Sequence, residues 1–546
     1  MSPRAWAAAA VLAACAAAYH PLRYAGFAYD DHIYVEDNSF VQDPANLRVF
    51  LDPRFYLADQ GLLAGSRPVF LASLLADRAV WGSRPAGYHL TSLLLHAANA
   101  LCVSALGAGL GLGLFGGTLA GLLFAVQPLL SEAVCGVSFR PDLLAALFAF
   151  AAVMVLRGAW ALERRAFLAR TAAATALFLL SLMSKESAAL APLAAFLPAP
   201  PRRRAVAALL ALAAAGLVYA AFRAPRFQYA LGLEAPRTQA DHAGLRILPP
   251  EAPRWQYAPS PPPWRALYAD AGLRARTMSA ETGAALLRLV RPGRPTVERL
   301  PVLRPSWASP AILGAWLVLA ALAAAAFLLR RRSPPASAGA AWVLAALVPV
   351  CGLVPLYNPT ADRYLYLPMA GAAWALAALI LALAGRAQER RREAALALTA
   401  LLALPWLTAT RRRAAEWESD KTLFAAEAGA PQGPRVPYNR AIMAISEGRA
   451  ADAEAELLEA LRRHPGFTEA WSKLGALYDA LGDAPRARAA FARGAAEPSP
   501  SPLPAYAFAR FLERRGERAA AAAVYQAALE RDPGFAPARA ALTGKP

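Results

Sequence analysis

The sequence predicts an all-α protein: a polytopic membrane bundle of about eleven helices, followed by an α-solenoid of helical repeats. Three observations support this fold class. Of the 546 residues, 57% are hydrophobic and only 17% are charged, which excludes a single water-soluble domain. Apolar stretches long enough to cross a bilayer recur through residues 1–410. Residues 411–546 are instead charged and periodic.

Apolar stretches of roughly 17–25 residues are expected to cross the hydrocarbon core. The first, 5–20, resembles a signal peptide. Tyr19-His20-Pro21 offers no convincing cleavage site, so we expect a retained anchor. The other expected spans are 88–107, 112–133, 141–157, 167–183, 186–199, 205–222, 308–329, 339–356, 366–385 and 393–410.

Arginine clusters predict the orientation of the bundle. They follow the fourth, sixth, eighth and tenth spans, at 157–170, 202–204, 330–332 and 386–392. Because basic residues are enriched on the cytoplasmic side, the amino terminus is expected there too. One triplet, Arg411-Arg412-Arg413, disagrees, since it falls on the outer side. The net charge is +19, but because the arginines cluster between apolar segments and set membrane orientation, we expect no nucleic-acid partner.

This orientation predicts two domains. Residues 1–410 form the membrane domain, with outward loops 20–87 and 223–307, and residues 411–546 form an outward repeat domain. Composition rich in Ala, Arg and Pro is typical of a GC-rich bacterial genome. The expected location is therefore a bacterial inner (plasma) membrane with a periplasmic repeat domain. In a eukaryotic host, it would be the endoplasmic reticulum membrane with a lumenal domain.

Residues from about Trp417 onward repeat with a period of 34. Glycines, alanines and larger side chains recur at this spacing: Gly448, Gly482, Gly516; Ala453, Ala487, Ala521; Leu457, Phe491, Tyr525. This period with small and aromatic positions is typical of the tetratricopeptide helix–turn–helix. Such solenoids bind extended peptides or partner proteins, and we expect the acceptor of any outer-face reaction to bind here. A purely structural cap is the alternative.

Acidic and basic residues gather where outward connections meet the membrane. The acids are Asp30, Asp31 and Glu132, and the bases are Arg67, Arg140, Lys185 and Arg363. Two carboxylates beside hydrocarbon are costly unless they serve a function. Basic groups there can bind the phosphate of a membrane-embedded lipid, and a carboxylate can act as general base. Neighbouring polar residues are candidates for substrate binding: Tyr29, His32, Gln127, Glu186 and Tyr364.

Each of these groups also has a structural interpretation. The acid doublet could cap a short helix. Arg67 before Pro68 could be an interfacial anchor, and Lys185-Glu186 could be a charge pair that ends a span. Arg363 with its tyrosines could belong to an interfacial aromatic belt. The histidines and the four cysteines show no metal-ligand spacing.

Taken together, these motifs resemble the transmembrane-and-tetratricopeptide-repeat O-mannosyltransferases, within the C-type polytopic glycosyltransferases. The matching segments run in family order along nearly the whole membrane region: Phe27-Ala-Tyr-Asp-Asp31, Ser66-Arg-Pro68, Gly87-Tyr-His-Leu90, Leu93-Leu-Leu-His96, Phe124-Ala-Val-Gln-Pro128, Ser131-Glu-Ala-Val134, Ser184-Lys-Glu186 and Ala361-Asp-Arg-Tyr-Leu-Tyr-Leu-Pro368. The chain departs from the family at Gln127, where a histidine is usual, and at Leu130, where a polar residue is usual.

The resemblance implies transfer of a sugar, mannose in this family, from a polyprenyl phosphate to Ser or Thr of a protein on the outer face. Asp31 or Asp30 would be the general base of one inverting displacement. Lys185, Arg363, Arg67 and Arg140 would bind the donor phosphate. No cofactor is required, although some relatives allow a divalent cation, here between Asp30 and Asp31.

Other functions fit the same sequence. The sugar acceptor could be a lipid or a glycan rather than a protein. A many-span oligosaccharide ligase could also end in repeats, but it would place its working loop late in the chain. The alternative in which the protein is not an enzyme is a non-catalytic membrane scaffold that displays the repeats.

Overall fold

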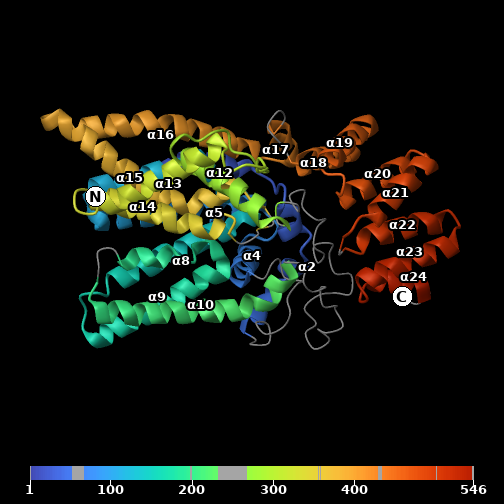
Figure 1. Ribbon diagram of the computed structural model, residues 1–546, viewed down its shortest axis with the longest axis horizontal. Helices are drawn as coiled ribbons and strands as arrows, with labels where there is room; N and C mark the ends of the chain where they lie inside the picture. The colour runs from blue at the N-terminus through green and yellow to red at the C-terminus, as the bar shows by residue number, and fades with distance from the viewer. Residues whose placement is uncertain are drawn as a thin grey trace.

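The structure, a computed structural model, describes residues 2–51, 67–196, 200–230, 267, 269–353, 356, 358–427, 433–499 and 501–543. Every regular element within these ranges is helical, which confirms the predicted fold class (Figure 1). Parts of the two predicted outward loops, residues 52–66 and 231–266, lie outside the described residues.

Eight helical segments among the described residues are long and apolar enough to cross a membrane, so the chain is a multi-pass membrane protein. One of them, Pro85–Ala125, holds two predicted spans, because Gly111 and Gly113 have positive φ and turn the chain between them. The membrane helices are α1 (Pro3–Tyr19), α5 (Pro85–Gly107), α6 (Gly113–Ala125), α8 (Arg140–Arg157), α9 (Arg164–Ser184), α10 (Arg202–Ala230), α13 (Pro310–Leu328), α15 (Tyr366–Ala384) and α16 (Arg391–Glu416).

Two predicted spans are shorter than expected. The described part of 186–199 forms two 3-10 turns, Glu186–Ala188 and Ala191–Phe196, and the predicted span 339–356 overlaps α14 (Pro334–Leu347). The predicted span 112–133 also ends early, at Ala125, because Pro128 cannot continue the helix. Two helices complete this part of the molecule: α4 (Pro68–Trp81) and the amphipathic α12 (Ala271–Val290).

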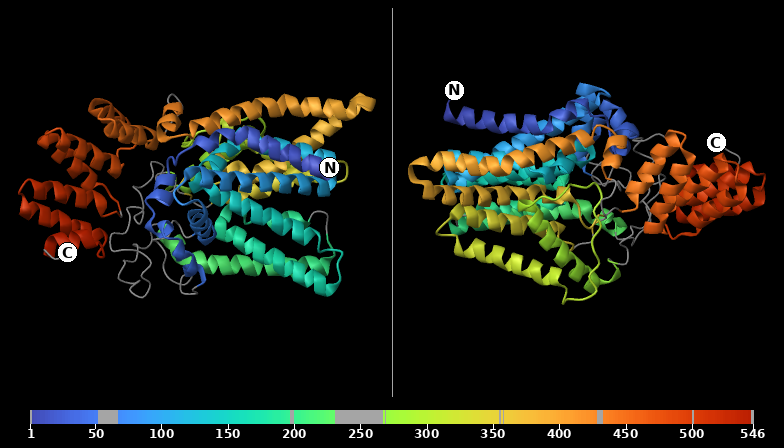
Figure 2. Two further views of the ribbon diagram at one scale, coloured as in Figure 1. Left: turned by 180° about the vertical axis from the view of Figure 1, so that it is seen from behind. Right: turned by 90° about the horizontal axis from the view of Figure 1, so that it is seen from above.

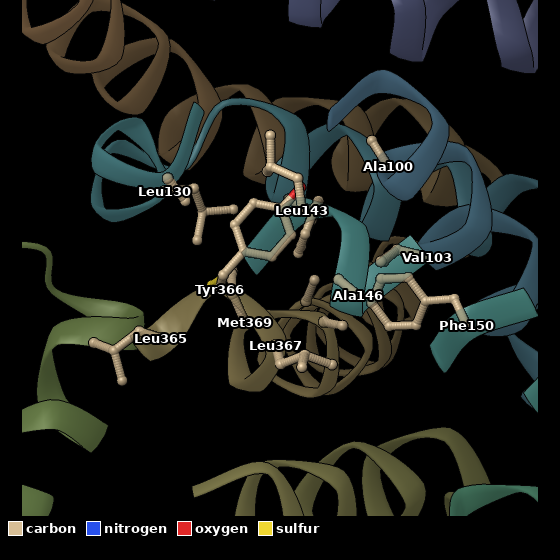
Figure 3. Close-up of a cluster of buried hydrophobic side chains, with 14 of the residues drawn as sticks. Ala100, Val103, Leu130, Leu143, Ala146, Phe150, Leu365, Tyr366, Leu367 and Met369 are labelled. Atoms are coloured by element: carbon tan, nitrogen blue, oxygen red, sulfur yellow. The ribbon is translucent and has the colours of Figure 1, made fainter. Parts of the chain in front are cut away.

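The core of the bundle lies around α15. Gly339 of α14 and Gly371 of α15 face each other so closely that a Cβ on Gly339 would lie 2.4 Å from the Gly371 carbonyl oxygen. Small residues allow membrane helices to approach in this way. Trp342 stacks on Phe150 at 5.5 Å, and Figure 3 shows Phe150 in the cluster of buried side chains with Tyr366. Because α15 is packed along its length, its first residues are held firmly.

The ends of the membrane helices lie at two opposite ends of the bundle. The turn between α8 and α9 lies at the same end of the bundle as the amino terminus, away from the repeats (Figures 1 and 2). At that end the Arg157 guanidinium donates to the Gly109 carbonyl at 3.2 Å, and Arg204 donates to the Trp160 carbonyl. The second, fourth and sixth predicted connections therefore meet at one end, as the alternation of spans requires. Their cytoplasmic side remains a prediction from the arginines.

The carboxy-terminal part is a row of helical hairpins (Figure 1). Three hairpins turn at Gly448, Gly482 and Gly516, with φ of 73°, 79° and 80°, which confirms the 34-residue period. Glycine adopts this left-handed conformation without strain. The helices are α18 (Arg435–Ser446), α19 (Ala450–Arg463), α20 (Thr468–Ala480), α21 (Ala484–Ala496), α22 (Leu503–Arg514), α23 (Arg518–Arg531) and α24 (Ala536–Thr543). We call α18 to α24 the repeat region.

The membrane and repeat parts are joined without a break at the predicted boundary. Helix α16 continues past residue 411 to Glu416, and the short helix α17 (Asp420–Ala426) follows. Arg413, 2% exposed, pairs with Glu427 at 2.8 Å and also with Glu416. The arginine triplet that disagreed with the predicted orientation therefore contributes at least one residue to a structural ion pair.

Alanine at Gly339 should destabilise the bundle, because its Cβ would collide with the backbone of α15. The matched control is Gly314→Ala in α13, where a Cβ would meet nothing within 4 Å. There the substitution should stabilise the helix by about 0.5–1 kcal/mol. Thermal unfolding of both variants in detergent should move the midpoint in opposite directions. Equal midpoints would contradict the close helix crossing.

Candidate active site

The acid doublet lies in a tight turn just beyond α1. Asp31 is fully buried, and both of its carboxylate oxygens accept backbone hydrogen bonds, from Val137 N at 3.1 Å and Ser138 N at 2.7 Å. These two amides belong to a 3-10 turn, Val137–Phe139, immediately before α8. Asp31 thus joins the first membrane span to the start of the fourth.

The two acids of the doublet have different surroundings. Burial raises the pKa of Asp31 to about 6, although its hydrogen bonds from Ser138 and Val137 oppose this. Burial also raises the pKa of Asp30, and the charges of Arg435 and Arg363 oppose that rise. Asp30 is only partly buried. Asp30 therefore has surface that a substrate can reach, whereas Asp31 is committed to the backbone.

The doublet does not fit a divalent cation. Mg²⁺ and similar ions need several oxygen ligands, and both oxygens of Asp31 already accept N–H groups. Within the described part of the chain, no three His, Cys, Asp or Glu side chains are grouped as metal ligands.

Arg363 is fixed beside the doublet by Glu132. The Glu132 carboxylate accepts from the Arg363 backbone N at 2.8 Å and from its guanidinium. Burial raises the pKa of Glu132, but the charge and hydrogen bonds of Arg363 oppose this, and a paired carboxylate is the consistent state. The guanidinium lies over the Phe139 ring, 4.4 Å from its centroid. This geometry confines the cation to one position.

Lys185 follows α9 and projects into the same region. Its Nζ lies 2.6 Å from both oxygens of Asp142 and 5.0 Å from the centroid of the Tyr364 ring. Burial lowers the pKa of Lys185 to about 8, Asp142 raises it, and the charges of Arg67 and Arg363 lower it further. The charges of Arg67 and Arg363 therefore repel Lys185, and an anionic ligand would offset that repulsion.

Arg67 is the least committed of these cations. It precedes α4 and is partly buried, and its Nε has no hydrogen-bond partner among the residues that the structure describes. Burial lowers its pKa, but the combined effect of Glu186, Asp142 and neighbouring tyrosines is larger, and the pKa is raised. Arg67 is thus the cation most available to an incoming phosphate.

Tyr34 lies near Asp30 and several of the arginines. Burial and the charge of Asp30 raise the pKa of its phenol, while Arg67, Arg363 and Arg435 lower it. A single side chain under the influence of the acid and of several cations places them in one region of the protein.

An apolar groove of about 330 Å³ opens beside these charges. Glu186 and Tyr219 are the polar residues in its lining, and the Tyr219 hydroxyl donates to Glu186 at 3.3 Å. The other lining residues come from α9, the turns after it, and α10: Phe178, Leu182, Ala189, Leu190, Pro192, Leu193, Leu209, Leu212, Ala213 and Gly216. Its composition suits a hydrocarbon chain with a polar end.

Two candidates occupy structural positions instead. Arg140 is fully buried, pairs with Asp77 at 2.6 Å and donates to the Tyr88 carbonyl at 2.9 Å. Arg140 is expected from the sequence to bind phosphate, but its side chain has no exposed surface that a phosphate could contact. Gln127 is also fully buried and donates to the Leu289 carbonyl at 3.0 Å, which ties it to α12. The departure from histidine at Gln127 therefore affects packing.

Other candidates support the turn that carries the acids. His32 pairs with Glu36 and, at 3.2 Å, with Asp420. The hydrogen bond to Asp420 is the main reason that the pKa of His32 rises to about 9, against the effect of burial. The Tyr29 backbone N donates to Asp420 at 2.7 Å. Both residues thus contact the segment that leads into the repeats.

Several residues of this site lie outside the set that the sequence predicts. Asp142 stands in the first turn of α8, where an ionisable residue at a membrane helix end is a detectable signal. Tyr34 carries no such signal. Asp420 and Arg435 belong to the region after the last span, and only the folded chain brings them to the acid turn.

The fold and this geometry define a polytopic all-α membrane protein with a charged site at one end of its bundle. No family model matches the chain. A segment of 122 residues is 34% identical to protein O-mannosyl-transferase Tmtc1 of Drosophila melanogaster, covering 22% of this chain and 14% of that protein. A segment of 128 residues is 34% identical to protein O-mannosyl-transferase TMTC2 of Homo sapiens, covering 23% of this chain and 15% of that protein.

The resemblance to these O-mannosyltransferases is thus confirmed over about a quarter of the chain, and the matched segment spans only 14% to 15% of their length. Among solved structures, the crystal structure of the Archaeoglobus fulgidus oligosaccharyltransferase tethered with an acceptor peptide aligns at 12% identity. That alignment has a TM-score of 0.39 and covers 78% of this chain and 57% of that chain.

If Arg140 is structural, Arg140→Met should destabilise the protein by about 3 kcal/mol, because it leaves the Asp77 carboxylate buried without its cation. Adding Asp77→Asn should recover much of the loss, since the amide oxygen can still accept from Thr91. Thermal unfolding of the single and double variants checks this. An unchanged midpoint with weakened phosphate binding would instead support the role expected from sequence.

Proposed function

We propose that this protein is a membrane glycosyltransferase that moves a hexose from a polyprenyl-phosphate donor to a hydroxyl of a polypeptide. The observation that carries the proposal is the convergence of an accessible acid, Asp30, with three cations at the polar end of an apolar groove. Similarity to named O-mannosyltransferases favours mannose as the sugar and Ser or Thr as the acceptor.

The groove and the cations suit the two parts of the donor. A polyprenyl chain is apolar and long, and the surface between α9 and α10 offers it hydrocarbon contacts. The phosphate bears a negative charge, and it would bind where the charges of Arg67 and Arg363 repel Lys185. Binding an anion there offsets that repulsion, with arginine able to bind phosphate through two N–H groups.

The proposed reaction is a single displacement with inversion. The acceptor oxygen bonds to the anomeric carbon while the bond from that carbon to the phosphate oxygen breaks. The hydroxyl proton passes to the Asp30 carboxylate, and polyprenyl phosphate leaves with an additional negative charge. The cations stabilise that charge as it develops, so no acid is needed for the leaving group. The raised pKa of Asp30 makes it a stronger base than a solvated aspartate.

The acceptor and the location complete the proposal. The repeat region lies at the end of the bundle that carries the charged site (Figure 1), so a polypeptide bound to it is close to Asp30. We assign this end to the outer face, because the arginine clusters lie at the opposite end. In a bacterium this is the periplasmic face of the inner membrane.

Asp30→Asn should lower kcat about 100-fold or more, because the amide cannot accept the acceptor proton. Asp37→Asn is the matched control, since Asp37 is an exposed acid seven positions along the same loop. The assay uses purified protein, polyprenyl-phosphate mannose and Ser/Thr peptides, with glycopeptide mass spectrometry. Unchanged transfer by Asp30→Asn would rule out this base. Absence of transfer by the wild type with any hexose donor would rule out the function.

Filling the groove should impair binding of the lipid part alone. Gly216→Phe places a ring in the groove of α10 and should raise KM several-fold for a long-chain donor, but little for a short-chain analogue. Gly314→Phe in α13 is the control, since nothing lies within 4 Å of a Cβ at either glycine. A KM that is equal for both donors would place the polyprenyl chain elsewhere.

A further inference from the structure

We propose that Asp420, in the segment that follows the last membrane span, is a positioning residue for the Asp30-Asp31 turn. This inference rests on the proposed function in one respect, namely that Asp30 acts as the base. Its structural part concerns the conformation of the turn and can be measured independently.

The turn before the acids has a strained backbone. Tyr29 has φ of 59°, and it is the one residue other than glycine with positive φ among the residues that the structure describes. An aromatic residue rarely adopts this left-handed conformation, because its Cβ crowds the following carbonyl. Such strain persists only where surrounding contacts over-determine it, and it is found at functional sites.

The Asp420 carboxylate supplies those contacts. One oxygen accepts from the Tyr29 backbone N at 2.7 Å, and the other lies 3.2 Å from His32 Nε2. Tyr29 and His32 flank the acid doublet, so a single carboxylate holds both ends of the Asp30-Asp31 pair. A hydrogen bond to an ionised acceptor is shorter and stronger than one between neutral groups.

Further contacts between the same two segments support the turn. The Gly26 backbone N donates to the Glu418 carbonyl at 2.9 Å. The ring centroids of Tyr29 and Phe424 are 5.9 Å apart, in an edge-on arrangement. The turn therefore packs against residues 418–424 on both sides of Asp420.

Asp420 is itself held in place by helix α17. Ser419 and Thr422 form a capping box at its start, so Asp420 stands at its first position. At the other end of the helix, Glu427 pairs with Arg413 and accepts from Val297 N at 3.3 Å. Both ends of α17 are thus fixed. Asp420, at the start of this helix, therefore holds the acid turn in a defined position through its hydrogen bonds.

The arrangement has a consequence for activity. The helix that leads from the membrane into the repeats also sets the geometry of the proposed base, so Asp30 depends on a residue almost 400 positions away in sequence. Misplacement of a reacting group by about 1 Å can cost about 100-fold in rate, whereas binding of a donor at other residues is unaffected.

The test compares Asp420→Ala with Asp420→Asn in the full-length protein. Asp420→Ala removes the acceptor for the Tyr29 N–H and should lower kcat at least tenfold, with KM for the donor unchanged. Asp420→Asn keeps an oxygen for that bond and should retain most of the activity. Asp452→Ala, which removes an exposed acid of α19, is the control and should change nothing.

A second substitution isolates the strain. Glycine adopts positive φ freely, so Tyr29→Gly should remove the need for Asp420. The loss caused by Asp420→Ala should therefore be less than about threefold in the Tyr29→Gly background, against about tenfold or more with tyrosine. Equal losses in both backgrounds would overturn the positioning role and leave only a general effect on folding.

Hydrogen exchange separates this inference from the proposed function. Asp420→Ala should speed exchange of the amides in a peptide that covers residues 25–38, while peptides from α15 stay protected. If the wild type transfers no sugar but this exchange changes, the function is wrong and the structural role of Asp420 holds. If exchange and kcat are both unchanged, the inference is wrong whatever the substrate.

Discussion

The requirement that charges buried at the end of the bundle have partners determines much of this structure. Arg140 is paired with Asp77, Lys185 with Asp142 and Arg363 with Glu132. An unpaired charge in this low-dielectric region would cost several kcal/mol. Each pair joins two different helices or turns, so the same pairs fix the relative positions of those elements. The groups left over, Asp30 and Arg67, are the ones that chemistry can use.

The sequence predicts the helices well, because hydrocarbon imposes a length and a composition that can be read directly. It also predicts the hairpins, since Gly448, Gly482 and Gly516 recur at a fixed spacing and only glycine suits their φ. It groups the acids and bases at one level of the membrane. What the sequence does not predict is which acid pairs with which base. Arg140 and Lys185 look alike in sequence, yet one is sealed in the core and the other lies beside the groove.

The site residues that could not be predicted are those whose contacts are with residues distant in sequence. Asp420 has no motif around it, and its contact with Tyr29 exists only after α16 has returned the chain to the acid turn. The strain at Tyr29 is likewise invisible, because tyrosine gives no warning of a positive φ. A functional residue can be predicted from sequence when it belongs to a local motif or when its charge is costly beside the membrane. A residue that acts only through tertiary contacts cannot be predicted in this way. The predicted boundary at residue 411 lies inside α16, which continues to Glu416.

The positive charges near Lys185 relate the structure of the site to its proposed chemistry. Burial is the main cause that lowers the pKa of Lys185 to about 8, and the charges of Arg67 and Arg363 add to that shift. A donor phosphate offsets part of that charge on binding. When the sugar leaves, the phosphate gains a further negative charge, and the same cations interact with it more strongly than with the intact donor. Stabilisation that grows along the reaction is what accelerates it. The negative charge that the leaving phosphate gains is therefore the charge that these cations would stabilise.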